Sequence, residues 1–220
     1  MRSIFRAAAE SSVAPTRMVW LPGAFDMPED FVKAGFDASV RSRRIPLDLV
    51  FVDAELEHLQ DRSVHDRLRR DILAPARELG CRSIWLAGIS LGGFIALDYA
   101  AGHPQDWDGL CLLAPYLGNR MLIAEIAGAG GLSNYQPGPL ADCDEERRIW
   151  RFIASRPAEA SRRADAKRMY LGYGREDRFA QAHALMAEAL GPDAAHVVSG
   201  GHDWPTWIAL WEYFLDSTFP

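Results

Sequence analysis

Residues 88–92 read Gly-Ile-Ser-Leu-Gly, so Ser90 stands between two glycines. A strand-like run leads directly into this pentapeptide, and a helix-like stretch over 91–102 follows it. A serine on such a turn projects its hydroxyl above the carboxyl end of a sheet, and glycines avoid collisions with the neighbouring strand and helix. The amide-rich N-terminus of the helix faces the same point. The pattern therefore predicts that Ser90 is a nucleophile.

A nucleophilic serine needs a base and a carboxylate that orients the base. On this type of turn the partners follow in the order serine, acid, histidine, each at the end of a later strand. Asp177 follows the strand-like run RMYLGYG, and His202 follows the strand-like run AAHVVSG. We therefore expect His202 to be the general base and Asp177 to orient it. Glu176 is the adjacent alternative, whereas Asp203 is better placed to cap the last helix.

An attacked carbonyl also needs backbone N–H groups that receive its developing negative charge. One expected donor is the amide of Leu91, directly after the nucleophile. The other should come from the loop 21–26 after the first strand. Ala24 is the preferred donor there and Phe25 the second choice, because Pro22 has no N–H.

Short apolar runs alternate with amphipathic segments along the chain. The runs are Met18–Leu21, Leu47–Val52, Ser83–Ala87, Gly109–Ala114, Met169–Gly172 and Ala195–Val198. The helix-like segments cover roughly 30–44, 63–80, 91–102, 144–165, 178–190 and 204–217. Apolar runs without two-residue alternation indicate strands buried on both faces. The alternation predicts an α/β fold: a three-layer α/β/α sandwich with a mostly parallel sheet of about six strands.

Residues 116–143 interrupt this rhythm with an apolar piece and a Gly- and Pro-rich run. Long connections inside a compact domain are usually binding loops or lids. We expect a small cap or lid here, and an elaborate surface loop is the alternative. Together with Phe25 and Trp204, Met121 in this segment is expected to line a pocket for a small or medium apolar acyl group.

These features resemble the α/β-hydrolase superfamily, in particular its small single-domain serine esterases. The resemblance runs from about residue 17 to residue 215. It rests on the GISLGG turn, the helix that ends in AGHPQDWDGLCLLAP, the acid loop GYGREDRF and the GGHDW loop. It implies Ser90 as nucleophile, His202 as general base, Asp177 as carboxylate and no cofactor.

The chain departs from the family pattern in two places. The family's usual first strands are expected to be missing, so the fold is shortened at its N-terminus, with residues 1–16 as a tail and 17–220 as the hydrolase domain. The common His-Gly of the oxyanion loop is replaced by Pro22-Gly23.

Composition and charge limit the kinds of ligand and partner that the chain is expected to bind. Lys plus Arg is 24 and Asp plus Glu is 30, a net charge of -6, which disfavours nucleic-acid binding. No run of apolar residues is long enough for a membrane span, and the opening segment lacks a secretory apolar region. The three cysteines form no CxxC pair, so a reducing cytoplasm is expected, with Cys81 and Cys111 buried and Cys143 exposed. Neither a metal site nor a dinucleotide or phosphate-binding motif is expected.

The sequence therefore predicts a cytoplasmic serine hydrolase that cleaves a small-molecule carboxylic ester or thioester through an acyl-enzyme. Two alternatives stay open. The same residues could serve an acyltransferase or a carrier thioesterase, or the chain could be a non-catalytic small-molecule binding module with this fold. The oligomeric state is left open.

Overall fold

The computed structural model describes residues 1–8, 13–54, 63–138, 141, 144–156 and 167–219. One seven-stranded sheet organises them, in the order β1-β3-β2-β4-β5-β6-β7. The strands are β1 (Ser3–Arg6), β2 (Thr16–Leu21), β3 (Leu47–Val52), β4 (Ser83–Ile89), β5 (Gly109–Leu113), β6 (Arg168–Gly174) and β7 (Ala195–Val198). Only β1 is antiparallel to its neighbour, so the expected α/β fold with a mostly parallel sheet is confirmed.

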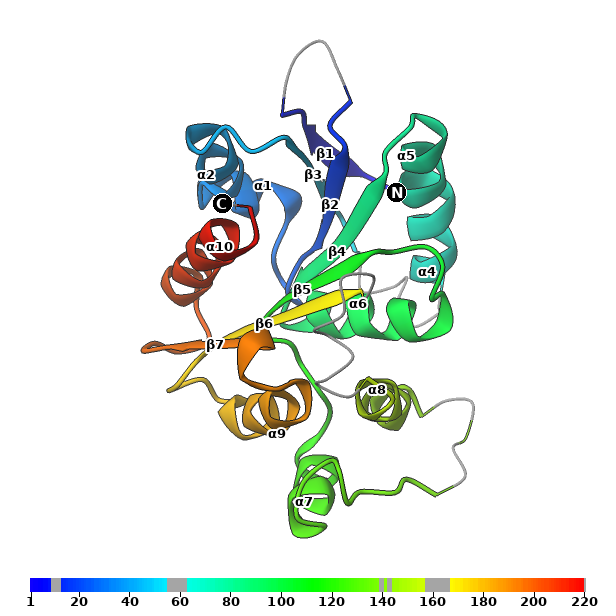
Figure 1. Ribbon diagram of the computed structural model, residues 1–220, viewed down its shortest axis with the longest axis vertical. Helices are drawn as coiled ribbons and strands as arrows, with labels where there is room; N and C mark the ends of the chain where they lie inside the picture. Colours follow the sequence, from blue (N-terminus) through cyan, green and yellow to red (C-terminus); the bar gives the residue numbers. More distant parts are fainter. Residues whose placement is uncertain (9–12, 55–62, 139–140, 142–143, 157–166, 220) are drawn as a thin grey trace.

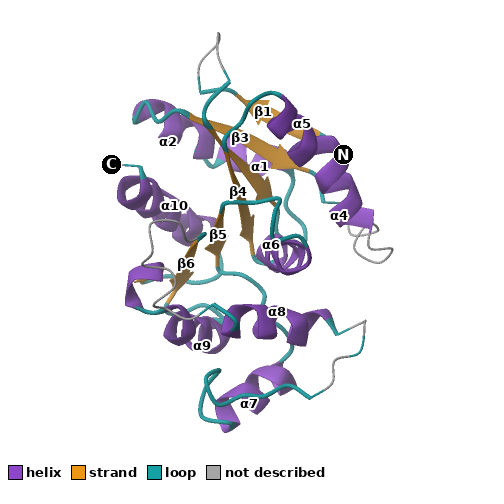
Figure 2. Cartoon of the chain, turned by 45° about the vertical axis from the view of Figure 1, so that its right-hand side comes forward, coloured by secondary structure: helices purple, strands orange, loops and turns teal. Residues whose placement is uncertain are grey.

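Helices cover both faces of this sheet (Figures 1 and 2). One face carries α1 (Pro28–Lys33), α2 (Phe36–Ser42) and α10 (Trp204–Thr218). The other carries α4 (Ser63–Leu68), the π-helical turn η1 (Arg69–Leu73), α5 (Ala74–Glu78), α6 (Leu91–Gly102), α8 (Glu145–Ala154) and α9 (Ala180–Leu190). A short 3-10 turn, η3 (Pro192–Ala194), leads into β7. Among these described helices, none is long and apolar enough to cross a membrane.

Each parallel strand supplies both cores, because successive side chains point to opposite faces of a sheet. In β2, Val19 and Leu21 pack toward α6, whereas Met18 and Trp20 pack toward α1, α2 and α10. This double burial explains why the strands are apolar runs without a two-residue alternation.

The chain order places two loops beside each other at the carboxyl edge of the sheet. After β2, the chain adds β3 on one side and then returns to add β4 on the other. Open α/β sheets bind ligands where strand order reverses in this way. The loop 22–27 after β2 and the turn after β4 therefore lie side by side at this edge.

The predicted N-terminal tail is wrong for residues 3–6, which form β1, and the sheet is one strand larger than expected. Ile4 pairs with Phe51 in the antiparallel ladder. The buried carboxylate of Asp48 holds the chain beyond β1, because it accepts the amides of Ala8 at 2.9 Å and Ala14 at 3.3 Å and pairs with Arg17 at 3.4 Å. A four-residue edge strand has too little apolar pattern to be visible in sequence.

The segment expected to form a cap contains α7 (Arg120–Gly128), which contacts α9 and lies outermost, beyond α8 and α9 (Figure 1). Its movement as a lid stays a prediction. Cys81 and Cys111 are buried, and Cys143 lies outside the described residues.

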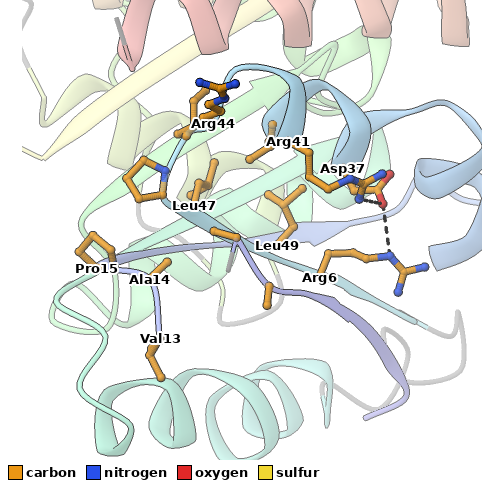
Figure 3. Close-up of a pocket in the computed structure, with 14 residues that line it drawn as sticks. Arg6, Val13, Ala14, Pro15, Asp37, Arg41, Arg44, Leu47 and Leu49 are labelled. Carbon is orange, nitrogen blue, oxygen red and sulfur yellow. Dashed lines mark hydrogen bonds and ion pairs between the residues drawn. The ribbon is translucent and has the colours of Figure 1, made fainter. Parts of the chain in front are cut away.

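A cavity of about 460 Å³ lies at the opposite edge of the sheet, beside the amino ends of β2 and β3 (Figure 3). It is walled mostly by aliphatic side chains, with Asp37 bound to Arg6 and Arg41 at one end. Residues 8 and 13, which border the undescribed 9–12, form part of its wall. The cavity is remote from the turn that carries Ser90.

We predict that Asp48→Ala lowers the free energy of unfolding by about 3–5 kcal/mol, because it leaves Arg17 as an uncompensated buried charge and removes an acceptor from two amides. Urea unfolding measures this. Asp216→Ala is the control, since that carboxylate pairs with Arg43 on the surface and its removal should not shift the transition midpoint. A loss below about 1 kcal/mol in Asp48→Ala would contradict the assignment.

Candidate active site

Ser90 lies between β4 and α6 in a backbone conformation that few non-glycine residues adopt. Its φ is 51° and its ψ is −113°. Its N–H donates to the carbonyl of Leu113 at 3.1 Å, and its carbonyl accepts the amide of Tyr116 at 2.9 Å. Strain of this kind persists only where the surroundings hold it, and it is typical of functional sites.

The glycines on either side of Ser90 are required by space. A Cβ on Gly92 would fall well inside van der Waals contact of the Leu21 carbonyl, and one on Gly88 would collide with the Gly92 backbone. Both collisions are with backbone atoms, which cannot move aside. Bare glycine surfaces therefore let the end of β2, the end of β4 and the start of α6 approach one another.

The structure brings Ser90, His202 and Asp177 into one hydrogen-bonded chain. The Ser90 hydroxyl donates to Nε2 of His202 at 2.9 Å, and Nδ1 of His202 donates to Oδ2 of Asp177 at 2.8 Å. The side chain of Asp177 is fully buried and that of His202 is 11% exposed. An ionised carboxylate can only accept, so it fixes the proton on Nδ1 and leaves Nε2 free to take the proton of the serine.

The carboxylate of Asp177 is held in its ionised form. Burial raises its pKa, but hydrogen bonds from His202 and from the amide of Phe179 at 2.8 Å outweigh burial and leave the pKa below the ordinary value. A carboxylate that stays charged at neutral pH can stabilise an imidazolium.

The alternative acids have other partners. Glu176 accepts the amide of Gly200 at 2.5 Å, which ties the acid loop to the histidine loop. Asp203 caps α10 by accepting the amide of Thr206 at 3.0 Å, as expected from the sequence. Of the acids weighed, Asp177 alone is hydrogen-bonded to Nδ1 of His202 within the described part of the chain.

The expected oxyanion donors lie on either side of Ser90. Leu91 is the first residue of α6, whose first amides have no acceptor within the helix. On the other side, Asp26 N–H donates to the Gly23 carbonyl at 3.2 Å and closes a turn over Ala24 and Phe25. A Cβ placed on Gly23 would lie 3.8 Å from Cβ of Ser90, so this turn lies against the serine. The choice of Ala24 as donor stays a prediction.

The expected pocket residues are not brought together. Phe25 is 92% exposed at the tip of its turn, and Met121 is 83% exposed because α7 turns Leu122 and Ile126 inward instead. Trp204 is half-buried and packs edge-on against Phe31, 5.4 Å between ring centroids. The structure thus differs from the sequence prediction, since neither Phe25 nor Met121 forms an enclosed wall.

Two aromatic residues that the sequence analysis missed stand beside the site instead. The Phe179 ring meets His202 edge-on at 5.2 Å and Tyr116 at 5.7 Å, measured between ring centroids. The Tyr116 hydroxyl donates to Glu146 of α8 at 2.7 Å. Both aromatic residues lie just beyond the carboxyl end of a strand, and that position alone was a signal that could have found them.

A second histidine lies behind the site. His183 is fully buried, its Nε2–H donates to the carbonyl of Pro115 at 2.9 Å, and its Nδ1 has no partner among the described residues. Burial lowers its pKa to about 4. It is therefore neutral at pH 7 and holds the segment that precedes Tyr116.

No group of three or more His, Cys, Asp or Glu side chains in the described ranges is arranged to hold a metal ion.

Comparison with known proteins identifies a family. The family model described as "Putative esterase" matches residues 57–212, which is more than half of the chain. No curated protein matches the sequence.

Solved structures of α/β serine hydrolases share the fold. S-formylglutathione hydrolase from Staphylococcus aureus aligns with a TM-score of 0.65 and 12% identity over 94% of this chain and 82% of its own. Est1E from Butyrivibrio proteoclasticus, with ferulic acid bound, gives 0.59 and 15% over 98% and 94%. Monoacylglycerol lipase from Paleococcus ferrophilus gives 0.58 and 14% over 99% and 100%. These likenesses establish the fold and its three-layer arrangement.

We predict that Gly92→Ala destabilises the protein by about 3 kcal/mol and abolishes any reactivity of Ser90, because the added methyl forces α6 away from the end of β2. Gly102→Ala is the matched control in the same helix, since nothing lies within 4 Å of its Cβ position. That variant should change stability by less than about 1 kcal/mol. Equal behaviour of the two variants in thermal unfolding would refute the packing argument.

We predict that burial of His183 makes the stability of the protein depend on pH. The ordinary pKa of histidine is 6.5 and that of His183 in the folded protein is about 4, so between these pH values the unfolded chain binds a proton that the folded chain does not bind. Stability should therefore fall as pH falls from about 6.5 to about 4, by about 3 kcal/mol.

The measurement is the free energy of unfolding in urea at several pH values, for wild type and His183→Gln. Gln keeps a donor for the Pro115 carbonyl, so the variant should lose this part of the slope. His196→Gln should keep most of the slope, because burial lowers the pKa of the half-exposed His196, which stacks on Tyr213, less far than that of His183. Parallel slopes in wild type and His183→Gln would show that His183 is not the group.

Proposed function

The chain belongs to this family of esterases, and from that premise we propose that it hydrolyses a carboxylic ester or thioester through Ser90. The observation that carries the proposal is the unbroken contact chain from Asp177 through His202 to Ser90, at 2.8 and 2.9 Å. A serine at hydrogen-bond distance from an oriented imidazole is the arrangement that activates a hydroxyl for attack on an acyl carbon.

In the proposed reaction, Ser90 Oγ forms a bond to the acyl carbon while its proton passes to Nε2 of His202. The carbonyl oxygen becomes an oxyanion that accepts hydrogen bonds from the backbone N–H groups of Leu91 and Ala24. The bond to the alcohol or thiol then breaks, and the leaving group takes the proton from Nε2. Water then gives a proton to the same nitrogen and attacks the acyl-enzyme. The bond between the acyl carbon and Ser90 Oγ breaks, the acid leaves, and Oγ regains a proton from Nε2.

Asp177 contributes by orientation and charge. Its buried carboxylate keeps the imidazole in the tautomer that accepts from serine, and it stabilises the imidazolium that forms after proton transfer. None of these steps calls on a cofactor. The two free buried cysteines support the reducing cytoplasm that the sequence favours.

The leaving group is proposed to be an alkoxide or a thiolate. The fold neighbours include a hydrolase of S-formylglutathione and a monoacylglycerol lipase, so by their names this fold serves thioesters as well as oxygen esters. The aromatic pair Phe179 and Tyr116 beside His202 supports an apolar group next to the scissile bond. Acyl transfer to an alcohol, amine or thiol stays the alternative, and product analysis with such acceptors separates it from hydrolysis.

We predict that a fluorophosphonate labels Ser90 in the purified protein, because the reagent traps a serine that is activated by histidine. Mass spectrometry of peptides locates the adduct. Labelling should vanish in Ser90→Ala and fall strongly in His202→Ala. With an ester substrate, Ser90→Ala, His202→Ala and Asp177→Asn should each lower kcat/KM by about 10³-fold or more.

Glu176→Gln is the matched control, since it changes the carboxylate next to Asp177 but keeps an acceptor for the Gly200 amide. It should change kcat/KM by less than about tenfold. A folded wild type that takes no label and turns over no ester would overturn the proposal and favour a non-catalytic binding module.

A further inference from the structure

The loop that carries the expected oxyanion amide ends in a carboxylate, that of Asp26. A negative charge is unexpected there, because the neighbouring amides are expected to receive a developing negative charge. No step of the proposed reaction uses Asp26, so its presence calls for a separate explanation.

The Asp26 carboxylate lies directly against the site. Its Oδ2 occupies the space where a Cβ of Gly23 would be, and Ser90 Cβ lies 3.8 Å from that same point. The amide of Gly23 and the side chain of Trp204 both face this carboxylate and lower its pKa. Asp26 thus lies between the loop after β2 and the residues that follow His202.

Within the part of the chain that the structure describes, no Lys or Arg forms an ion pair with Asp26 or is among the main influences on its pKa. Burial is the main influence on its pKa and raises it, Asp30 raises it further, and the hydrogen bonds and His202 lower it. Asp30, by contrast, is matched by Lys33 at 2.9 Å. Asp26 is thus a half-buried negative charge near the nucleophile, with neutral hydrogen-bond donors and the catalytic imidazole around it.

We propose that Asp26 is a specificity-determining residue, which makes the site prefer esters with a positively charged group near the scissile bond and reject those with a carboxylate there. This group would lie on the β2 side of Ser90, whereas the Phe179–Tyr116 pair faces an apolar group from the side of β5 and β6. This inference rests on the proposed hydrolase function and names its substrate class. A cationic group there would pair with the Asp26 carboxylate, whereas an anionic group would place a second negative charge beside it. Charges about 6 Å apart in such a setting change a rate by roughly tenfold or more.

The test compares three esters that differ only at the end of the acyl chain. They are 4-nitrophenyl butanoate and its analogues with a terminal carboxylate or a terminal trimethylammonium group. A second series places the same three groups on the alcohol of an acetate ester. In at least one series, wild-type kcat/KM should fall in the order cationic, neutral, anionic. Asp26→Asn, which keeps an oxygen acceptor for Gly23 and Trp204, should reduce the cation-to-anion ratio by about tenfold.

Asp30→Asn is the matched control, since it removes a nearby carboxylate that Lys33 already neutralises, and it should keep the wild-type ratio. Fluorophosphonate labelling of Ser90 verifies that the site of Asp26→Asn is intact. The wild-type protein alone gives a further test. Raising the salt concentration from about 0.05 to about 0.5 M should lower its cation-to-anion ratio of kcat/KM, because salt screens the charge of Asp26.

The outcomes separate the two proposals. Equal turnover of all esters by wild type, or a ratio that Asp26→Asn leaves unchanged, overturns charge selection but keeps the hydrolase. A loss of ratio that Asp30→Asn shares equally also overturns the assignment to Asp26. Turnover of none of the six esters together with no labelling of Ser90 overturns the hydrolase function itself.

Discussion

The close approach of α6 to the ends of β2 and β4 is the constraint on which the rest of the site depends. Gly88 and Gly92 make it possible, because any side chain there would collide with backbone. The approach bends Ser90 into its unusual backbone conformation and presses the start of α6 against the loop after β2. One packing contact therefore positions Ser90, the proposed nucleophile, together with both expected oxyanion donors, and strain at Ser90 is the cost of that arrangement.

The parallel sheet brings Asp177 and His202 close to Ser90. Since β4, β5, β6 and β7 all end at one edge, their following loops meet there, and Asp177 and His202 need no long reach. Glu176 fastens the acid loop to Gly200, so the spacing between acid and base depends on backbone contacts as well as on the two side chains. The buried carboxylate and the partly exposed imidazole follow from this placement.

The sequence pattern predicted the parallel strands, including one at the edge of the sheet. The predicted bounds match the structure at both ends for β3, which is buried at every residue, and for the half-buried edge strand β7, since apolar runs between polar turns leave little freedom. The pattern did not predict β1, which forms only by pairing with the distant strand β3. The pattern also predicted a pocket position for Phe25, which the structure instead exposes to solvent. The reason is that the direction of a side chain at a turn is set by the turn and not by the residue type. His183 was missed because its partner is a backbone carbonyl that only the fold brings near.

Tyr116 joins three parts of the molecule at once. Its amide binds the Ser90 carbonyl, its ring contacts Phe179, and its hydroxyl binds Glu146 of α8, which also accepts the amide of Asn119. The chain between β5 and α7 is thus clamped along its first residues. Any movement of α7 must therefore begin after Asn119. Residues 116–119 would stay in place during that movement, so the backbone around Ser90 would not follow it.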